Sequence, residues 1–161
     1  MPAPLPILQV RDLTVSFDTP EGTVEAVRGI SFDVERGKTF AIVGESGSGK
    51  SVTAHALLGL TREARARGQA LFDGRDLLAL PEPELRDIRG ASIAMIFQNP
   101  HASLHPSYRI GWQIEEAIHI HERASRGDAR ERAIDLLRLV GIADPERRVD
   151  DYPHELSGGM Q

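Results

Sequence analysis

Short alternating or wholly apolar runs in the first hundred residues predict β-strands. Residues 7–17 (ILQVRDLTVSF) alternate imperfectly and are rich in β-branched side chains, and residues 23–34 resume this character after the turn sequence DTPEG. The two runs predict an antiparallel pair. Residues 39–44 (TFAIVG) and 92–97 (SIAMIF) are short and largely apolar, which is typical of strands buried on both faces of a parallel sheet. Residues 69–74 predict a further short strand and turn.

Apolar residues at helical spacing follow the first of these buried runs. Residues 51–60 (SVTAHALLGL) predict a helix that is apolar on nearly all sides and therefore buried. The next stretch, residues 61–68 (TREARARG), is polar and predicts a loop or a frayed helix end. Residues 81–90 predict a second helix that begins near Pro83, because proline is favoured in the first turn of a helix.

The last third of the chain predicts helices joined by a polar segment. Residues 110–122 place isoleucines at helical spacing. A following helix is predicted to begin with Asp128 and Glu131 in a capping-box arrangement and to stop at Gly141. Residues 144–155 (DPERRVDDYPHE) predict a polar connector whose prolines limit helix length.

Composition narrows the kind of protein. The 161 residues, 40% of them hydrophobic, are enough for one soluble domain with a buried core. The net charge of -5 gives no general attraction to nucleic acid or anionic lipid, so no nucleic-acid partner is expected. The absence of cysteine excludes disulfides. The first ten residues do not resemble a secretory signal, and no apolar run approaches the ~20 residues that span a bilayer, so any membrane connection is expected to run through a partner.

The sequence GESGSGKS, Gly44 to Ser51, carries the strongest chemical signal. It fits G-x-x-x-x-G-K-S/T between an apolar run and a helix, which is the context of a phosphate-binding loop. Glycines let successive backbone N–H groups converge on phosphate, Lys50 supplies a compact positive charge for the β- and γ-phosphates, and the Ser51 hydroxyl can ligate Mg²⁺. A nucleoside triphosphate is the predicted ligand. The residues predicted to bind it are Gly44, Glu45, Ser46, Gly47, Ser48, Gly49, Lys50, Ser51 and Val52.

Gln98 is a second candidate for chemistry. It follows the apolar run 92–97 and opens a proline-rich segment. A glutamine at the carboxyl end of a strand beside a phosphate-binding loop can reach Mg²⁺ or the attacking water. Gln98 could equally be a strand-end residue bonded to backbone, so this signal alone leaves both interpretations open.

The sequence LSGGMQ, residues 156–161, predicts a second anion site. Ser157 can act as an N-cap and hydroxyl donor, while Gly158 and Gly159 expose amides at the start of a helix. One triphosphate rarely needs two such sites within one chain. The plainer interpretation is an ordinary helix start softened by glycine.

The phosphate-binding loop, Gln98 and LSGGMQ, in that order, resemble the nucleotide-binding subunit of ATP-binding cassette (ABC) transporters. In that family two subunits pair head to tail, which implies that the signature of one subunit caps the γ-phosphate held by the loop of the other. The implied signature residues are Leu156, Ser157, Gly158, Gly159, Met160 and Gln161. Phe17 aligns with the aromatic residue that stacks on adenine, although it could also be a core aromatic at a strand end.

The resemblance implies an α/β fold: a P-loop NTPase (ABC ATPase) core with an antiparallel N-terminal β-subdomain and an inserted helical subdomain. Residues 1–97 would form the β-subdomain and P-loop core, and residues 98–161 the Q-loop, helical subdomain and signature. The chain would be truncated before the Walker B strand, so it lacks the Mg²⁺-binding aspartate, the catalytic glutamate and the switch histidine. We therefore expect an incomplete record of a longer subunit, and we expect this chain alone to bind ATP poorly and to hydrolyse it negligibly.

Three longer stretches resemble the branch that imports oligopeptides, dipeptides and nickel: residues 15–51, 95–106 and 152–161. The dipeptides Asn99-Pro100 and His105-Pro106 stand where that branch more often has Asp-Pro and Asn-Pro, which leaves the substrate subgroup open. By analogy, residues 99–113 and the following helices would receive a coupling helix from the membrane subunit through a surface containing Tyr108 and Trp112. Burial of Trp112 within the helical subdomain is the alternative.

The resemblance implies an ATP-binding subunit that couples ATP binding and hydrolysis to import of peptides or a related small solute. Its catalytic residues here would be Lys50 and Gln98, with Mg²⁺ held by Ser51 and Gln98. Its partners would be a second nucleotide-binding subunit, identical or related, membrane-spanning permease subunits and, indirectly, an extracytoplasmic solute-binding protein. It would lie peripherally on the cytoplasmic face of the inner membrane. The alternatives are a soluble ABC-type ATPase not tied to transport and a non-hydrolytic nucleotide-binding fragment; a P-loop kinase would leave LSGGMQ without a role.

Overall fold

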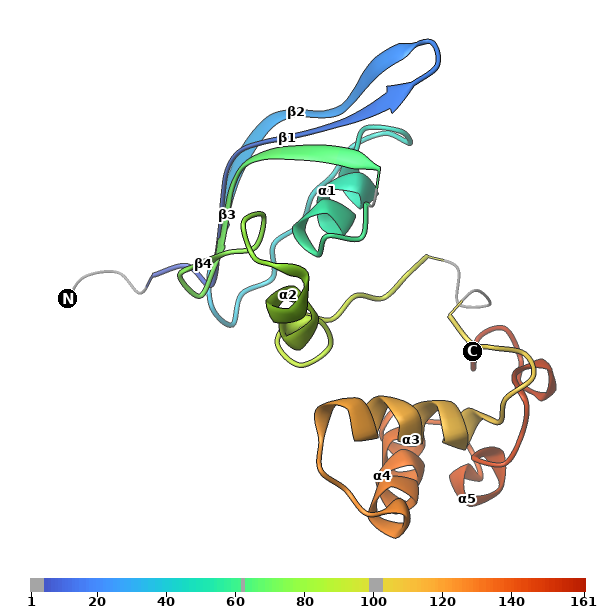
Figure 1. The fold of residues 1–161 in the computed structure, drawn as a ribbon. Helices are drawn as coiled ribbons and strands as arrows, with labels where there is room; N and C mark the ends of the chain where they lie inside the picture. Colours follow the sequence, from blue (N-terminus) through green and yellow to red (C-terminus); the bar gives the residue numbers. More distant parts are fainter. Residues whose placement is uncertain (1–4, 62, 99–102) are drawn as a thin grey trace. The chain divides into compact units, whose positions relative to one another are not determined.

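The computed structural model describes residues 5–61, 63–98 and 103–161. The chain divides into two compact units, one ending at Ser92 and the other comprising Ile93–Gln161 (Figure 1). The predicted subdivision at residues 97 and 98 stays a prediction. The dipeptide Asn99-Pro100, on which part of the subgroup interpretation rests, lies outside the described residues.

The first unit is built on a four-stranded sheet of order β2-β1-β3-β4. Its strands are β1 (Leu8–Thr19), β2 (Gly22–Val34), β3 (Ala64–Phe72) and β4 (Arg75–Asp76), and every pairing between neighbours is antiparallel. The predicted pairing of the first two runs is confirmed. The strands bury Val10, Leu13, Val15, Val27 and Ala70.

Strand β3 begins earlier than the sequence predicted. Residues 64–67 belong to the strand and pair with β1, so the prediction of a loop or frayed helix end was wrong there. Ala64 and Ala66 are half-buried opposite Phe17 and Val15, whereas Arg65 and Arg67 are exposed. Alanine and arginine alternate with the period of two that is typical of a strand. This alternation was missed in the sequence because the two arginines made the segment look polar throughout.

The described part of the first unit also contains two helices. Helix α1 (Lys50–Leu57) buries Thr53 and Ala56 on one face, but Ser51 and Ala54 are exposed, so burial on nearly all sides was the wrong expectation. Helix α2 (Glu82–Ile88) has proline in its first turn, as predicted, and buries Leu85 and Ile88.

The two apolar runs expected to be parallel strands are not strands in the structure. Residues 39–44 and 92–97 contribute to none of the described strands. Val43 is 91% exposed and Ile96 is 100% exposed. A strand is stabilised by backbone hydrogen bonds to a neighbour, and no described strand pairs with either run. The apolar composition therefore identified segments that need partners, rather than strands that form alone.

The second unit is helical. It contains α3 (Ile110–His121), α4 (Arg126–Leu139), the single turn α5 (Pro145–Arg148) and a 3-10 helix, Pro153–Glu155. The predicted helix after residue 110 is confirmed. The hydrophobic core of the second unit consists of Ile110, Ile118, Ala129, Ala133, Leu137, Val149 and Leu156.

The capping box of α4 begins at Ser125, three residues before the predicted one. The Ser125 side chain accepts a hydrogen bond from the Asp128 backbone N–H (3.2 Å), and the Asp128 carboxylate accepts one from the Ser125 N–H (3.3 Å). The prediction of Asp128 and Glu131 as the box was therefore wrong, because serine satisfies the free N–H groups at the helix start. The helix ends before Gly141, as predicted.

Residues 144–155, predicted as a polar connector, contain two short helices and buried side chains. Pro145 and Pro153 each stand in the first turn of a short helix and are buried, and Val149 has no exposed surface. The prolines thus start helical turns here. In the described part of the chain, no helix is long and apolar enough to cross a bilayer.

Candidate functional site

The loop Gly44–Ser51 joins the exposed run 39–43 to α1, and its shape depends on glycine. Gly47 and Gly49 have φ values of 83° and 91°, which lie in the left-handed region. Gly49 is also the N-cap of α1, and a Cβ there would collide with the carbonyl oxygen of Ala26 in β2. Gly44 does not have a positive φ. Glycine is favoured there because a Cβ would stand only 2.7 Å from the Ser48 Oγ.

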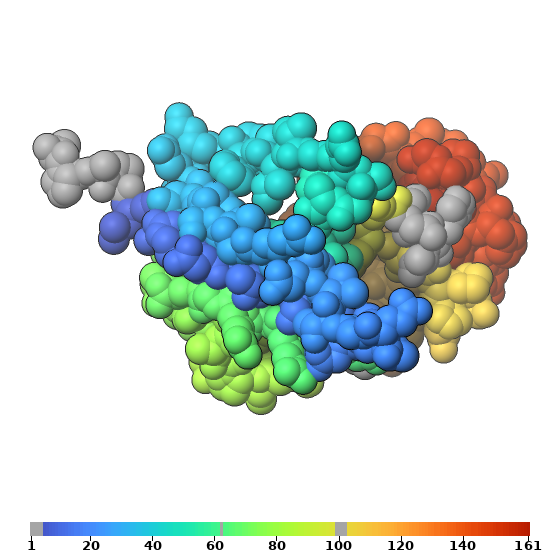
Figure 2. All heavy atoms as spheres, turned by 90° about the horizontal axis from the view of Figure 1, so that it is seen from above, coloured from blue at the N-terminus to red at the C-terminus, as the bar shows by residue number. Residues whose placement is uncertain are grey.

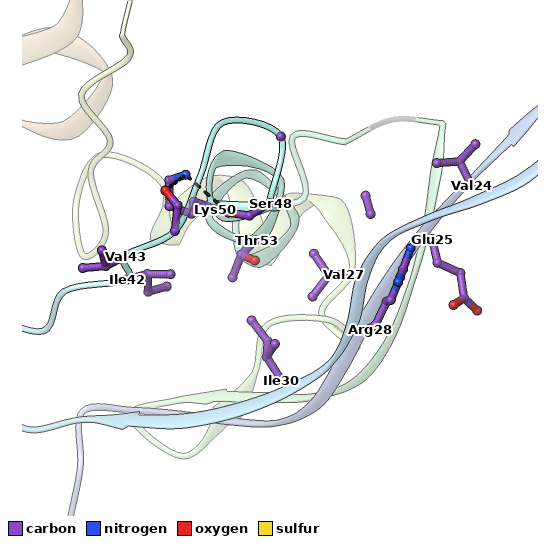
Figure 3. A pocket seen from close by; sticks show the side chains of 13 residues that line it. Val24, Glu25, Val27, Arg28, Ile30, Ile42, Val43, Ser48, Lys50 and Thr53 are labelled. Atoms are coloured by element: carbon purple, nitrogen blue, oxygen red, sulfur yellow. Dashed lines mark hydrogen bonds between the residues drawn. The ribbon is translucent and has the colours of Figure 1, made fainter.

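Lys50 folds back over this loop. Its Nζ donates to the carbonyl oxygens of Gly44 (2.8 Å) and Glu45 (2.7 Å), and to the Oγ of Ser48 (3.3 Å). Figure 3 shows the Lys50 side chain turned toward Ser48 at the start of α1. The positive charge is therefore held at the centre of the loop, beside the N-terminal end of a helix.

The first turn of α1 supports the same end of the helix. The backbone N–H of Thr53 donates to the carbonyl oxygen of Gly49 (2.8 Å), and the Thr53 hydroxyl donates to the same oxygen (3.0 Å). Ser51 is exposed in this turn. An ammonium group, a helix N-terminus and an exposed hydroxyl at one end of a helix together can bind a phosphate and a hard cation.

A cavity of about 770 Å³ lies beside the loop and is bounded by β2 and α1. The space-filling view shows a gap between the cyan loop segment and the blue strands (Figure 2). Val27 and Ile30 point from β2 toward α1 (Figure 3). The lining residues are Val24, Glu25, Ala26, Val27, Arg28, Ile30, Ile42, Val43, Gly44, Gly47, Ser48, Lys50 and Thr53. The contribution of β2 was missed by sequence reasoning, because the strand's register against the loop leaves no signal in the sequence.

Phe17 lies near the end of β1, directly opposite Val24 of β2. Side chains of directly paired residues in an antiparallel ladder project from the same face of the sheet. Val24 lines the cavity, and Phe17 is half-buried. Phe17 thus stands beside the cavity-lining part of β2, on the face that Val24 presents.

The signature residues form a tight turn in the second unit. The backbone N–H groups of Met160 (2.9 Å) and Gln161 (3.1 Å) both donate to the carbonyl oxygen of Ser157. Gln161 closes the turn, because its Nε2 donates to the carbonyl oxygens of Pro153 and Leu156. The bonds to Ser157 are those of a first helical turn, but residues 156–161 form a turn and not a helix.

Gly158 and Gly159 differ from the glycines of the loop. Both are exposed, neither has a positive φ, and within the described residues no heavy atom lies within 4 Å of the position a Cβ would take at either one.

Gln98 is exposed and belongs to the second unit, as does the signature turn, whereas Lys50 and Ser51 belong to the first unit. In their separate units, Gly44–Ser51 forms a loop around Lys50 and Leu156–Gln161 forms a turn, and the binding roles expected for both stay predictions.

An aromatic surface, defined here as His105, Tyr108 and Trp112, is displayed at the start of α3. The rings of Tyr108 and Trp112 stack with centroids 4.4 Å apart, and His105 lies 4.7 Å from Tyr108. Gln113 fixes the turn beneath them by donating to the carbonyl oxygens of His105 (3.1 Å) and Tyr108 (2.9 Å). Tyr108 and Trp112 are each 46% exposed, so burial of Trp112 was the wrong alternative.

Asp150 forms ion pairs with two arginines of the second unit. Its Oδ2 lies 2.7 Å from an Arg130 guanidinium nitrogen, and its Oδ1 lies 3.4 Å from one of Arg109. The hydrogen bond from Arg130, followed by the charges of Arg130 and Arg109, lowers the pKa of Asp150 below its usual range. The Arg109 guanidinium lies over the ring of Tyr152, 5.9 Å from its centroid, and its interaction with Tyr152 is the main cause that raises the pKa of Arg109. These contacts join α4, the residue preceding α3 and the segment that leads to the signature turn.

A glycine-shaped loop that carries lysine onto a helix N-terminus, beside an antiparallel sheet and followed by a helical unit, defines the class of P-loop cassette proteins. The chain belongs to the ABC transporter family, whose model matches residues 27–161. It is 49% identical over 158 residues to the oligopeptide transport ATP-binding protein OppD of Bacillus subtilis (strain 168), covering 96% of this chain and 44% of that protein. It is also 49% identical to the dipeptide transport ATP-binding protein DppD of the same strain, covering 96% of this chain and 47% of that one.

The fold is confirmed by solved structures. The dimeric structure of MJ0796, a bacterial ABC transporter cassette, superposes with a TM-score of 0.82 at 24% identity, over 95% of this chain and 64% of that one. The α/β cassette fold expected from the motifs is therefore correct. The chain spans less than half the length of the two curated relatives.

Proposed function

We propose that this chain is the nucleotide-binding part of an ATP-driven importer of peptides or a related small solute. The observation that carries the proposal is the loop Gly44–Ser51, which holds Lys50 at the N-terminus of α1. The names of the curated relatives, which are ATP-binding proteins of oligopeptide and dipeptide transport, support the same function and the peptide substrate. Hydrolysis is proposed for the whole subunit.

The phosphates of ATP would lie over the loop. The Lys50 ammonium has three N–H groups, and three acceptors lie within reach of it. Its contact with the Ser48 hydroxyl, at 3.3 Å, is the longest and therefore the one most readily exchanged for a phosphate oxygen. Lys50 would then remain tied to the loop by two carbonyl groups while it neutralises the phosphate. The same residue would stabilise charge that develops during hydrolysis.

The positions of three other residues suggest how they would bind Mg²⁺ and the adenine of ATP. Ser51 is exposed in the first turn of α1, where its hydroxyl could hold Mg²⁺. When bound, Mg²⁺ neutralises the phosphate charge. Gln98 would supply a second ligand or orient the attacking water. Phe17, opposite the cavity-lining Val24, would stack on adenine.

The signature turn would face a second copy of the subunit, or a related one. Gly158 and Gly159 are exposed, and no described atom of the chain approaches them. Nothing in the fold of the turn requires glycine at these positions. A close approach from outside the chain, such as a phosphate held by the partner's loop, gives a physical reason for the missing side chains.

The membrane partner would dock on the aromatic surface. Stacked, half-exposed rings beside a cavity of about 580 Å³ offer a socket for a short helix of a permease subunit. The subunit would therefore lie on the cytoplasmic face of the membrane, with the extracytoplasmic solute-binding protein engaged only through the permease.

A lysine pair provides the test of nucleotide use. In the longer subunit, assembled with its permease, Lys50→Ala should abolish peptide uptake and ATP hydrolysis. Lys38→Ala is the matched control, because Lys38 is exposed and is the only other lysine in the chain. Uptake that persists in the Lys50→Ala complex would refute the proposal.

Cross-linking tests the composite site. The chain has no cysteine, so the single changes Ser48→Cys and Ser157→Cys introduce unique thiols here. Mixed protomers should cross-link between positions 48 and 157 when ATP is present and hydrolysis is blocked. The exposed Ser107 provides a control position, Ser107→Cys, at which no cross-link to position 48 is expected.

A further inference from the structure

Helix α3 and the segment before the signature turn make an unusually close backbone contact at Gly111. The backbone N–H of Gly111 donates to the carbonyl oxygen of Val149 (2.7 Å), and that of Ile110 donates to the carbonyl oxygen of Asp151 (2.9 Å). The first turn of α3 therefore places its free N–H groups on the chain at 149–151.

Only glycine permits this contact. A Cβ at residue 111 would stand 2.6 Å from the Val149 carbonyl oxygen and would also overlap the Val149 side chain. Val149 has no exposed surface and lies in the core with Ile110 and Leu156, so it cannot retreat without opening that core. Glycine is required here by the steric clash of a Cβ and not by backbone conformation, since the φ of Gly111 is not positive.

The contact joins two surfaces with different proposed tasks. On one side, α3 carries Trp112, whose ring stacks on that of Tyr108 just before the helix, and both belong to the aromatic surface. On the other side, the chain runs from Val149 to the buried Leu156, whose carbonyl oxygen accepts the Gln161 side chain at 3.1 Å. Leu156 and Val149 belong to the same apolar core.

We propose that Gly111 is a positioning residue: by allowing α3 to lie directly on Val149, it fixes the turn Leu156–Gln161 relative to the aromatic surface. The tasks of the two surfaces rest on the proposed function, but the mechanical link does not. A displacement of Trp112 by a docked partner would then move the signature turn with it.

Two glycine-to-alanine changes separate this role from a general effect of alanine. Gly111→Ala should weaken the link, whereas Gly127→Ala, in helix α4, is the matched control because a Cβ there meets only the Ser125 Oγ, at 3.9 Å. In this chain, amide hydrogen exchange at Ile110, Met160 and Gln161 should accelerate about tenfold or more in Gly111→Ala, which corresponds to the lower part of the usual overpacking cost. The amides of Ala133 and Leu137 should change less than about twofold.

The result that would overturn the proposal is faster exchange at Ile110 with unchanged exchange at Met160 and Gln161. If Gly111→Ala unfolds the whole unit, Asp150→Asn decides, because it loosens the same segment by weakening its contacts with Arg130 and Arg109. It should accelerate Met160 and Gln161 a few-fold, and no acceleration there would also overturn the proposal.

A nucleotide titration keeps the two proposals apart. In the longer subunit kept unpaired, ATP binding should be equal in the wild type and in Gly111→Ala, because the loop and Lys50 lie in the other unit, and it should fall in Lys50→Ala. A longer subunit that binds no ATP would refute the proposed function and leave the exchange result standing.

Discussion

Two glycine-rich segments, the loop Gly44–Ser51 and the signature turn Leu156–Gln161, differ in how far the fold requires their glycines. In the loop Gly44–Ser51, glycine is required from within, by left-handed backbone at Gly47 and Gly49 and by the approach of Ala26. In the signature turn, Gly158 and Gly159 have no positive φ, and among the described residues no heavy atom beyond their chain neighbours lies within 4 Å of where a Cβ would stand. The first segment needs its glycines in order to fold. The geometry of the second segment does not demand glycine. Under the proposed function, the glycines leave room for a phosphate held by a partner's loop.

The difference predicts a graded response to alanine, and the largest loss of stability is expected at Gly49. Gly49→Ala combines a left-handed residue, costing about 1–2 kcal/mol, with overpacking against β2, costing about 1–3 kcal/mol. The free energy of unfolding, measured by urea titration, should therefore fall by roughly 3 kcal/mol. A loss no larger than that of Gly47→Ala would mean that contact with Ala26 does not constrain the loop.

Gly47→Ala isolates the backbone contribution. The residue has a positive φ, but no described atom lies within 4 Å of the position a Cβ would take. The expected cost is the left-handed conformation alone, about 1–2 kcal/mol. Gly47→Asn is the control, because asparagine tolerates this conformation better and should recover part of the stability. Equal losses for the two variants would contradict the backbone explanation.

A smaller, pH-dependent effect is expected in the segment that supports the signature turn. Arg130 and Arg109 lower the pKa of Asp150. Its stabilising contribution is therefore present above the unfolded-state pKa of about 3.9 and is lost as pH falls through the lower folded-state pKa. Asp150→Asn should cost at most about 1 kcal/mol at pH 7, because the pair is half exposed and screened by solvent.

The measurement is the difference in unfolding free energy between the wild type and Asp150→Asn at pH 7 and at pH 3. The difference should shrink at pH 3 and also on adding salt at pH 7. A difference that grows on acidification would contradict the assigned direction of the pKa shift.

The smallest effect on stability is expected at Gly158. Gly158→Ala adds a methyl group in open space without left-handed strain, so the free energy of unfolding should stay within about 0.5 kcal/mol of the wild type. Under the proposed function, the same change should weaken ATP-dependent pairing of longer subunits, measured by analytical ultracentrifugation. Lost stability with unchanged pairing would reverse the comparison between the two segments.

The sequence located elements where local chemistry was sufficient. The hairpin of β1 and β2, the helix after the phosphate-binding loop and the helix from Ile110 all follow from hydrophobic spacing and loop chemistry. It failed where a distant partner decided the outcome. Residues 64–67 became a strand because β1 offers a pairing edge, and residues 39–44 formed no strand because none of the described strands pairs with them.

In the candidate site, too, some features could be predicted from the sequence and others depended on tertiary packing. The identities Lys50, Ser51 and Ser157 could be read from motifs, because each motif is contiguous and its chemistry is local. The cavity wall from β2, the exposure of Trp112 and the contact of Gly111 with Val149 could not be read, since each depends on how separate segments pack.

The sequence by itself therefore determined the family, the phosphate-binding loop and the order of the motifs, because these depend on residue types at fixed short spacing. Only the tertiary structure decided which glycines are required by the fold and which are left open. Steric demand at a backbone position comes from atoms far away in the chain, such as the Ala26 carbonyl at Gly49 and the Val149 carbonyl at Gly111, and no local pattern records their approach.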